Sequence, residues 1–276
     1  MADAARVGGP YTVVSLHAHP DDETLLTGGL LARVAAEGHR TVVVTATAGE
    51  QGLTGDAREL GARRVEELKA AAQELGVQQV EVLGYPDSGS AGAVPPGAFC
   101  TVPVEEVARR VAAILEAEQA DVLTIYDERG GYGHRDHVQV HRVGIRAAEL
   151  ARTPVVLEAT VDRATLARGL RLARTLRFRL DGDQGGKGGA DGYAERAMIT
   201  HRVDVRDQYP KVRRALRCHA SQMTGGSGLR TVSLLAHLPA PLGRRVLGRQ
   251  WLTERGRLAG PAPLDDIFAT LREGSQ

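Results

Sequence analysis

The chain has 276 residues, of which 42% are hydrophobic, and a formal net charge of +1. This length and apolar content allow one large α/β domain or two small ones. The near-zero charge gives no general argument for nucleic acid or an anionic membrane as a partner. Aromatic residues make up only 4%, which disfavours a base-stacking surface. No apolar run approaches the roughly 18 residues of a membrane span, so we expect no membrane association.

The two cysteines, Cys100 and Cys218, lie far apart in the sequence and have no metal-type spacing. This cysteine usage is typical of a protein in a reducing compartment. The first residues carry no hydrophobic signal region. We therefore expect a cytoplasmic location.

The first predicted strand covers residues 11–16, which are short, β-branched and mostly apolar, as in a buried parallel strand. A helix with apolar residues at helical spacing follows and ends near Gly38. Between them lies the motif His-Ala-His-Pro-Asp-Asp-Glu, residues 17–23. Pro20 favours extended backbone at His19 and suits the first turn of the helix. The motif is therefore predicted to lie on a strand-to-helix turn.

Strands and helices alternate through the next part of the chain. This alternation predicts an α/β fold with a mostly parallel sheet and helices on both faces, in the common doubly wound strand order 3-2-1-4-5. The loop 85–103 is too long for a plain connection and is a functional candidate. The predicted strands are 40–47, 80–84, 121–126 and 155–161, and the predicted helices are 57–75, 103–119 and 136–152.

The pattern loosens after Asp162. Six arginines between 163 and 179 are read as the solvated face of a helix, with a phosphate-binding surface as the alternative. We expect the last part of the chain to pack back on the core, because Trp251, Ile267, Phe268 and Leu271 need burial. The whole chain, 1–276, is then one domain, with a core of about 11–222 and a C-terminal extension of about 223–276. The other predicted elements are a flexible loop at 182–192, a strand at 198–205 and a helix at 206–223.

The acidic residues of the first motif have two possible roles. Asp21 and Asp22 could simply favour the positive end of a helix. That role does not require His19, which lies three positions before Asp22, where one tight turn can bring imidazole and carboxylate together. Because adjacent aspartates cannot both face one point, one could bind a metal while the other reaches a bound water. A metal or catalytic site is the favoured interpretation.

A second polar motif, residues 126–137 (Tyr-Asp-Glu-Arg-Gly-Gly-Tyr-Gly-His-Arg-Asp-His), follows the fourth predicted strand. In the doubly wound order, strands one and four are neighbours at the switch point where such sheets bind ligands. The two motifs are therefore predicted to meet. His19, Asp22 and His137 would supply two imidazoles and one carboxylate and leave an open position, as in catalytic zinc sites. The same three ligands could hold Fe(II).

Two more histidines lie close to these ligands in the sequence. His141 follows His137 by one helical turn, and we expect it to support that ligand rather than to bind the metal. His17 precedes His19 by two positions, on the same face of the strand. For His17 we expect a packed side chain.

The sequence resembles the LmbE/PIG-L family of zinc-dependent de-N-acetylases. The resemblance rests on the two motifs at 18–23 and 133–137, at matching places in the fold, and extends to 64–68, 87–89 and 215–222. It implies a Rossmann-like fold and a metal-dependent hydrolase that removes an N-acetyl group from a glucosamine-type small molecule. Many members have proline where this chain has Arg135. Because that residue is not a ligand, we expect no loss of activity from the difference.

Roles for individual residues follow from the same resemblance. His19, Asp22 and His137 resemble the ligands of Zn²⁺, with another divalent metal such as Fe²⁺ as the alternative. Asp21 resembles the general base and His134 the residue that assists the tetrahedral intermediate. The remaining implied roles are orientation of an adjacent histidine by Asp136, covering of the substrate by Tyr132, and substrate binding by Arg64, Asp87 and His219, the last with a buried helix histidine as an equal alternative.

Three functions remain open at this point. The first is an N-deacetylase acting on an N-acylated aminosugar. The second is an amidase that cleaves a larger acyl group from an aminosugar conjugate, such as a mycothiol adduct. The third is a sugar-binding module without catalysis, which the presence of ligands, base and oxyanion donor together disfavours. Assembly into a homo-oligomer is compatible with all three.

Overall fold

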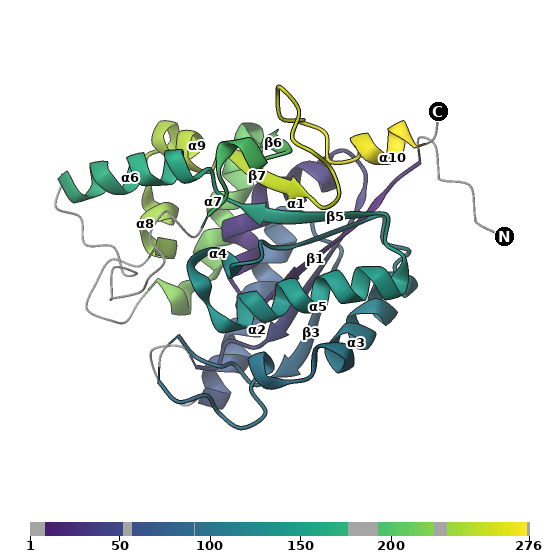
Figure 1. Ribbon diagram of the computed structural model, residues 1–276. Helices are drawn as coiled ribbons and strands as arrows, with labels where there is room; N and C mark the ends of the chain where they lie inside the picture. Colours follow the sequence, from purple (N-terminus) through teal and green to yellow (C-terminus); the bar gives the residue numbers. More distant parts are fainter. Residues whose placement is uncertain (1–8, 52–56, 91, 176–192, 224–230, 275–276) are drawn as a thin grey trace.

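The computed structural model describes residues 9–51, 57–90, 92–175, 193–223 and 231–274. Within them, a 7-stranded sheet with the order β3-β2-β1-β4-β5-β7-β6 runs through the centre of the molecule (Figure 1). The order of strands β1 to β5 within the sheet confirms the predicted order 3-2-1-4-5. The strands are β1 Thr12–His17, β2 Arg40–Thr47, β3 Gln79–Tyr85, β4 Val122–Tyr126, β5 Val155–Thr160, β6 His201–Asp204 and β7 Arg249–Glu254.

The pairing of β1 determines where the carboxyl ends of the central strands meet. β1 is parallel to β2, with Thr12 opposite Arg40, and parallel to β4, with Val13 opposite Val122. β4 and β5 are parallel as well, whereas β7 is antiparallel to both β5 and β6. The sheet is therefore mixed but mostly parallel, and β1 and β4 are neighbours with their carboxyl ends at the same edge.

Helices cover both faces of the sheet, as predicted. On one face, Val14 of β1 packs with Val111 of α3 and Val143 of α5. On the other face, Val13 packs with Leu30 of α1. All six residues of β1 are buried, as expected for a parallel strand between two helical layers. The helices are α1 Gly28–Ala36, α2 Ala57–Leu75, α3 Val104–Ala117, α4 Gly130–Gly133, α5 Arg135–Ala151, α6 Arg163–Thr175, α7 Tyr209–Cys218, α8 Thr231–His237, α9 Ala240–Leu247 and α10 Ala269–Glu273.

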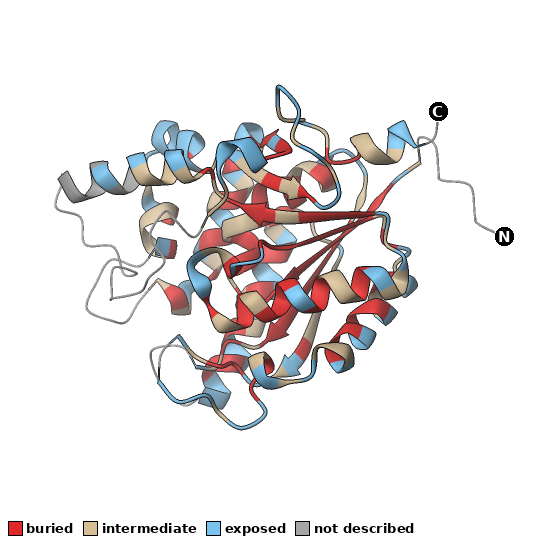
Figure 2. Cartoon of the chain, in the orientation of Figure 1, coloured by how far each residue is buried: buried red, intermediate tan, exposed pale blue. Residues whose placement is uncertain are grey.

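Burial follows the same layering. Figure 2 shows buried residues concentrated in the strands and on the helix sides that face them, with exposed residues on the outer helix surfaces. α2 contacts the sheet on the α1 side, where Leu68 packs with Leu31 and Val43. α7 lies outside this layer and packs Val212 and Leu216 against Leu75. The chain thus places α7 next to α2, far from it in sequence.

The region after β5 differs from the prediction in detail. Strand β6 is shorter than the predicted 198–205, because a 3-10 turn, Arg196–Met198, precedes it. The predicted helix 206–223 is α7 with 3-10 turns at both ends, Arg206–Gln208 and Ala220–Gln222. The backbone leaves helical geometry at His219, whose side chain contacts the first motif instead. The predicted loop 182–192 and residues 176–179 lie outside the described residues.

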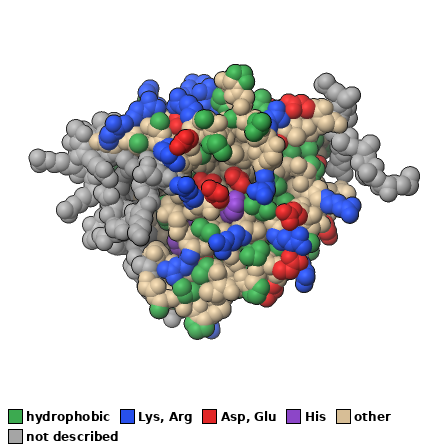
Figure 3. Space-filling model, viewed as in Figure 1, with side chains coloured by type: hydrophobic (Ala, Val, Ile, Leu, Met, Phe, Trp, Pro, Cys, Tyr) green, Lys and Arg blue, Asp and Glu red, His purple; other side chains and the backbone are tan. Residues whose placement is uncertain are grey.

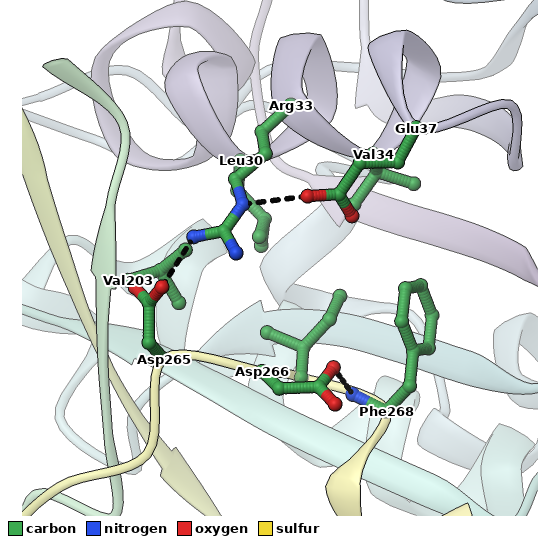
Figure 4. Close-up of a pocket in the computed structure, with 9 residues that line it drawn as sticks. Leu30, Arg33, Val34, Glu37, Val203, Asp265, Asp266 and Phe268 are labelled. Carbon is green, nitrogen blue, oxygen red and sulfur yellow. Dashed lines mark hydrogen bonds and ion pairs between the residues drawn. The ribbon is translucent and has the colours of Figure 1, made fainter. Parts of the chain in front are cut away.

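The C-terminal extension packs on the same sheet, as predicted, and supplies β7 between β5 and β6. Beyond β7, Arg33 of α1 donates from Nη1 to Asp265 Oδ2 over 3.0 Å, and the Asp204 amide donates to Asp265 Oδ1 over 2.6 Å. Figure 4 shows Arg33 between Glu37 and Asp265, with Phe268 below. Of the four residues predicted to need burial, Ile267 and Phe268 are buried, whereas Trp251 and Leu271 are only half-buried. The organisation of the whole chain as one domain stays a prediction.

The surface carries charges of both signs. Figure 3 shows Lys and Arg gathered at the upper left of that face and mixed with Asp and Glu across its middle. Cys100 and Cys218 are both free thiols. In the described part of the chain, no helix has the length and hydropathy of a transmembrane span.

The contact between α5 and β4 leaves no room for a side chain at Gly144. A Cβ there would lie 2.4 Å from Ile125 Cγ2, so Gly144→Ala should force α5 away from the sheet and cost about 1–3 kcal/mol of stability. The matched control is Gly28→Ala in helical backbone, where the nearest atoms lie at 3.4 and 3.6 Å and stability should stay equal or rise slightly. Urea unfolding of both variants measures this. Equal midpoints for the two would contradict it.

Candidate active site

The two polar motifs meet at the carboxyl ends of β1 and β4. His19 follows β1, His137 lies in the first turns of α5 after β4, and their ring centroids are 5.4 Å apart. The ring of Tyr126, the last residue of β4, stacks on His137 with centroids 4.1 Å apart. The predicted convergence of the two motifs is therefore observed.

Asp22 lies between the two imidazoles. Its Oδ2 is 3.3 Å from His19 Nδ1 and 3.4 Å from His137 Nε2. Zinc–ligand bonds of about 2.0–2.1 Å in a tetrahedral site place ligand atoms about 3.3–3.4 Å apart, which matches these two distances. His137 Nδ1 donates to the Gly130 carbonyl over 3.2 Å, which leaves the lone pair on Nε2. That Nε2 is buried and makes no hydrogen bond within the described residues. Asp22 therefore lies at ligand spacing from each histidine, although these three do not form one of the described groups whose ligand atoms all lie within 4.8 Å of one another.

Further donors surround these three. His134 joins His19 and His137 in a group whose ligand atoms lie within 4.8 Å of one another. Asp87 and Asp136 form a second such group with His19. All of these side chains are buried. The structure thus contains a His/Asp cluster able to bind a metal.

The far side of the His19 ring is held by carboxylates. Nε2 lies 3.2 Å from Asp136 Oδ2 and 3.3 Å from Asp87 Oδ1. Burial alone would lower the pKa of His19, but its hydrogen bonds to Asp136, Asp22 and Asp87 raise it well above the usual value. On the other side of the ring, Nδ1 is the atom that faces Asp22. Asp136 is itself fixed by Ser88, whose amide and hydroxyl donate over 3.0 and 2.8 Å.

The backbone conformation at Asp21 differs from the predicted helix start. The helix does not begin at Pro20 and Asp21, because Asp21 has a positive φ of 103° and its amide donates to Glu23 Oε2 over 2.9 Å. A π-helical turn, Glu23–Thr27, follows and continues into α1. Burial raises the pKa of the Asp21 carboxyl to about 6, although Arg64 beside it acts in the opposite direction. A carboxyl in this range can take up a proton and return it near neutral pH.

Arg64 and Asp87, predicted as substrate contacts, are both engaged with the protein. Arg64 of α2 is 5% exposed and donates to the carbonyls of Gly49 and Pro20, over 2.8 and 2.5 Å, and to Asp21 Oδ2 over 3.2 Å. A side chain at Gly49 would collide with the guanidinium. Asp87, 4% exposed, lies against His19 and accepts from the Gly89 amide over 2.8 Å.

His134 and Tyr132 lie beside His19 and His137. His134 Nδ1 accepts the Asp136 amide over 3.2 Å, so a neutral ring carries its proton on Nε2 and can donate it. Burial, with His19 and His137 nearby, lowers the pKa of His134 to about 4 and keeps the ring neutral at pH 7. The Tyr132 ring lies 5.0 Å from that of His137 and is 55% exposed, so it is the part of this cluster nearest to solvent.

Three further histidines near the two motifs are buried. His219 is fully buried, with Nε2 2.9 Å from Glu23 Oε1, a placement that agrees with the buried alternative. His17 is packed, as expected, and its Nε2 lies 2.7 Å from Ser15 Oγ. His141 donates from Nδ1 to the Tyr126 carbonyl over 3.1 Å. Its partner Tyr126 is the residue whose ring stacks on His137.

The sequence analysis overlooked three residues that complete the site. Glu23, Ser88 and Tyr126 hold Asp21, Asp136 and His137, respectively. All three lie in or beside the sequence motifs from which the site was predicted. Their position in the sequence was therefore the one indication that they belong to the site. Their partners could not be inferred, because a hydrogen bond such as that of Ser88 to Asp136 joins different elements, and the stacking of Tyr126 on His137 depends on how α5 packs against β4.

Comparisons with known proteins identify the family. The family model "PIG-L: GlcNAc-PI de-N-acetylase" matches residues 14–148. The 1D-myo-inositol 2-acetamido-2-deoxy-alpha-D-glucopyranoside deacetylase of Thermomonospora curvata is 35% identical over 95% of this chain and 96% of that protein. The enzyme of the same name from Streptomyces griseus is 38% identical over 75% of this chain and 74% of that protein.

Solved structures share the fold. The N,N'-diacetylchitobiose deacetylase of Pyrococcus horikoshii is 24% identical, with a TM-score of 0.54 over 77% of this chain and 71% of that one. The 4-carboxy-2-hydroxymuconate hydratase of Pseudomonas putida is 16% identical, with a TM-score of 0.57 over 91% of this chain and 99% of that one. At such identities the likeness concerns the fold alone. On the similarity to the two curated deacetylases and the family match, the chain belongs to the PIG-L (GlcNAc-PI de-N-acetylase) family.

Proposed function

We propose that the protein is a zinc-dependent hydrolase that removes the N-acetyl group from a glucosamine linked to a small molecule. The observation that carries this proposal is the position of Asp22 Oδ2 between His19 Nδ1 and His137 Nε2, with the Asp21 carboxylate next to it in the chain. The names of the curated relatives make 1D-myo-inositol 2-acetamido-2-deoxy-α-D-glucopyranoside the first substrate to test. A cytoplasmic location and a possible homo-oligomer remain predictions.

His19, Asp22 and His137 would hold the zinc. When bound, zinc supplies a Lewis acid for the acetyl carbonyl and lowers the pKa of a coordinated water to about 7. Asp21 then accepts the proton of the attacking water and later delivers a proton to the leaving amine, a role typically worth about 10²–10⁴ in rate. Its pKa of about 6 suits both steps.

His134 is proposed to donate its Nε2 proton to the oxyanion of the tetrahedral intermediate. A well-placed donor contributes on the order of 10²–10³ in rate. The Asp136 amide supports this role because its bond to His134 Nδ1 selects the tautomer that donates. Tyr132 is proposed to cover a bound sugar, and its exposed ring, 5.0 Å from that of His137, supports this role.

Arg64 and Asp87 are proposed to act mainly on other site residues. The hydrogen bonds of Arg64 reach Asp21 and two backbone carbonyls, and Asp87 lies against His19. These contacts favour holding the base and a ligand over direct contact with the sugar. Fe²⁺ remains the alternative metal, because the same three ligands suit it.

Metal binding should depend on Asp22 but not on Asp21. Loss of an outer partner of a ligand already costs about 10–100-fold in affinity, so Asp22→Asn should weaken zinc binding by at least that factor. Asp21→Asn is the matched control and should bind zinc as the wild type does. At 100 times Kd, zinc should stabilise the wild type and Asp21→Asn by about 2.7 kcal/mol against unfolding. Equal zinc stabilisation of Asp22→Asn would disprove its role as a ligand.

Release of acetate and free amine tests the reaction itself. The zinc-loaded protein should release both from the N-acetylglucosaminyl inositol, and Asp21→Asn should lower kcat by about 10²–10⁴ with its zinc content intact. A parallel assay with a larger N-acyl group on the same sugar separates the deacetylase from the amidase alternative. Binding of the sugar without amine release, in zinc-loaded wild type, would favour the non-catalytic alternative.

A further inference from the structure

We propose that His219 and Glu23 form a buried pair that sets the backbone of Asp21 and thereby positions its carboxylate. His219 is then a positioning residue and not a substrate contact. The inference rests on the proposed function only where it treats Asp21 as the general base. The contacts themselves are independent of that role.

The backbone of Asp21 is unusual. Among the described residues, three other than glycine have a positive φ: Asp21 at 103°, Gln119 at 49° and Arg152 at 55°. Gln119 and Arg152 follow helices, in the left-handed conformation that commonly ends them. The φ of Asp21 lies beyond that region, and such a conformation persists only when surrounding contacts hold it.

Three groups of Asp21 are held by separate contacts. Its carbonyl accepts the amides of Thr24 and Leu25, both over 3.1 Å. Its carboxylate accepts from Arg64 over 3.2 Å. Its amide, which precedes the helical turn and has no partner within it, donates to Glu23 Oε2 over 2.9 Å. Glu23 is therefore the contact that fixes the amide end of the residue.

Glu23 in turn depends on His219. The carboxylate is fully buried, and a buried carboxylate is stable only when paired and hydrogen-bonded. Its second oxygen, Oε1, accepts from the Thr24 hydroxyl and lies 2.9 Å from His219 Nε2. His219 is also fully buried and lies 196 positions further along the chain. The imidazole is the distant partner that keeps the carboxylate turned toward Asp21.

Helix α2 anchors both ends of this arrangement. Glu67 accepts the amide and hydroxyl of Ser221 over 2.8 and 2.6 Å and so fixes the 3-10 turn that follows His219. One turn earlier on α2, Arg64 holds the Asp21 carboxylate. Helix α2 thus holds the side chain of Asp21 directly, through Arg64, and its backbone indirectly, through the turn that carries His219.

Two substitutions of His219 separate positioning from other roles. His219→Leu keeps a buried side chain but removes the donor, whereas His219→Gln can offer an amide N–H near the position of Nε2. Because a displacement of about 1 Å can cost on the order of 10²-fold in rate, His219→Leu should lower kcat by that order. KM and zinc content should stay within twofold of the wild type. His219→Gln should recover most of kcat.

A readout without turnover tests the same contact. In the wild type and His219→Gln, the Asp21 amide should exchange slowly with solvent and show a downfield proton shift, as expected for a donor to a carboxylate. In His219→Leu the shift should move upfield and exchange should become faster. The matched control is His201→Leu, another fully buried histidine outside the site, which should change neither the Asp21 amide nor kcat.

Each contrary outcome overturns the inference. A rise in KM with unchanged kcat would make His219 a substrate contact, and a lower melting temperature with unchanged kcat would make it only a stabilising residue. If the wild type releases no amine, the proposed function fails, and the Asp21 amide alone decides the inference. If His219→Leu does not fold, Ser221→Ala must reproduce the change in the Asp21 amide in weaker form, and an unchanged amide there refutes the pair.

Discussion

The parallel pairing of β1 with β4 is the constraint on which the rest of the site depends. It sets the carboxyl ends of two strands side by side at the point where the strand order reverses, and each strand leads directly into a polar motif. His19 and His137 come from different strands yet share one carboxylate, Asp22. No local turn could create this arrangement, because the two motifs approach only through the sheet.

The charges of the site explain why so many of its polar groups are buried and paired. Asp22, Asp87 and Asp136 all lie within 3.4 Å of a histidine nitrogen, and all have pKa values below the usual range despite burial. Three buried carboxylates around histidine side chains form a cluster whose charge a divalent cation would balance. Asp21 differs from them because burial raises its pKa, which suits a group that moves protons.

The fold alone does not determine the reaction. A hydratase and a deacetylase both share this architecture at similar TM-scores, although their chemistry differs. The assignment to the family therefore depends on the curated relatives, and the proposed chemistry depends on the residues at the switch point. The C-terminal segment matters as well: it adds β7 to the sheet, and α7 brings His219 beneath the first motif.

The sequence by itself determined the alternation of strands and helices, the strand order and the meeting of the two motifs. These follow from apolar periodicity and from the geometry of doubly wound sheets, both of which can be read locally. The packed state of His17 and the burial of Ile267 and Phe268 were predictable for the same reason.

Only the tertiary structure decided the φ of Asp21, the contact between Glu23 and His219 and the engagement of Arg64 with Asp21. It also decided the antiparallel insertion of β7 between β5 and β6. Local sequence encodes backbone preference and periodicity, and Pro-Asp-Asp-Glu reads as an ordinary helix start. The conformation of Asp21 depends on the contact between Glu23 and His219, which lie 196 positions apart in the sequence. That contact forms only when the helices pack together.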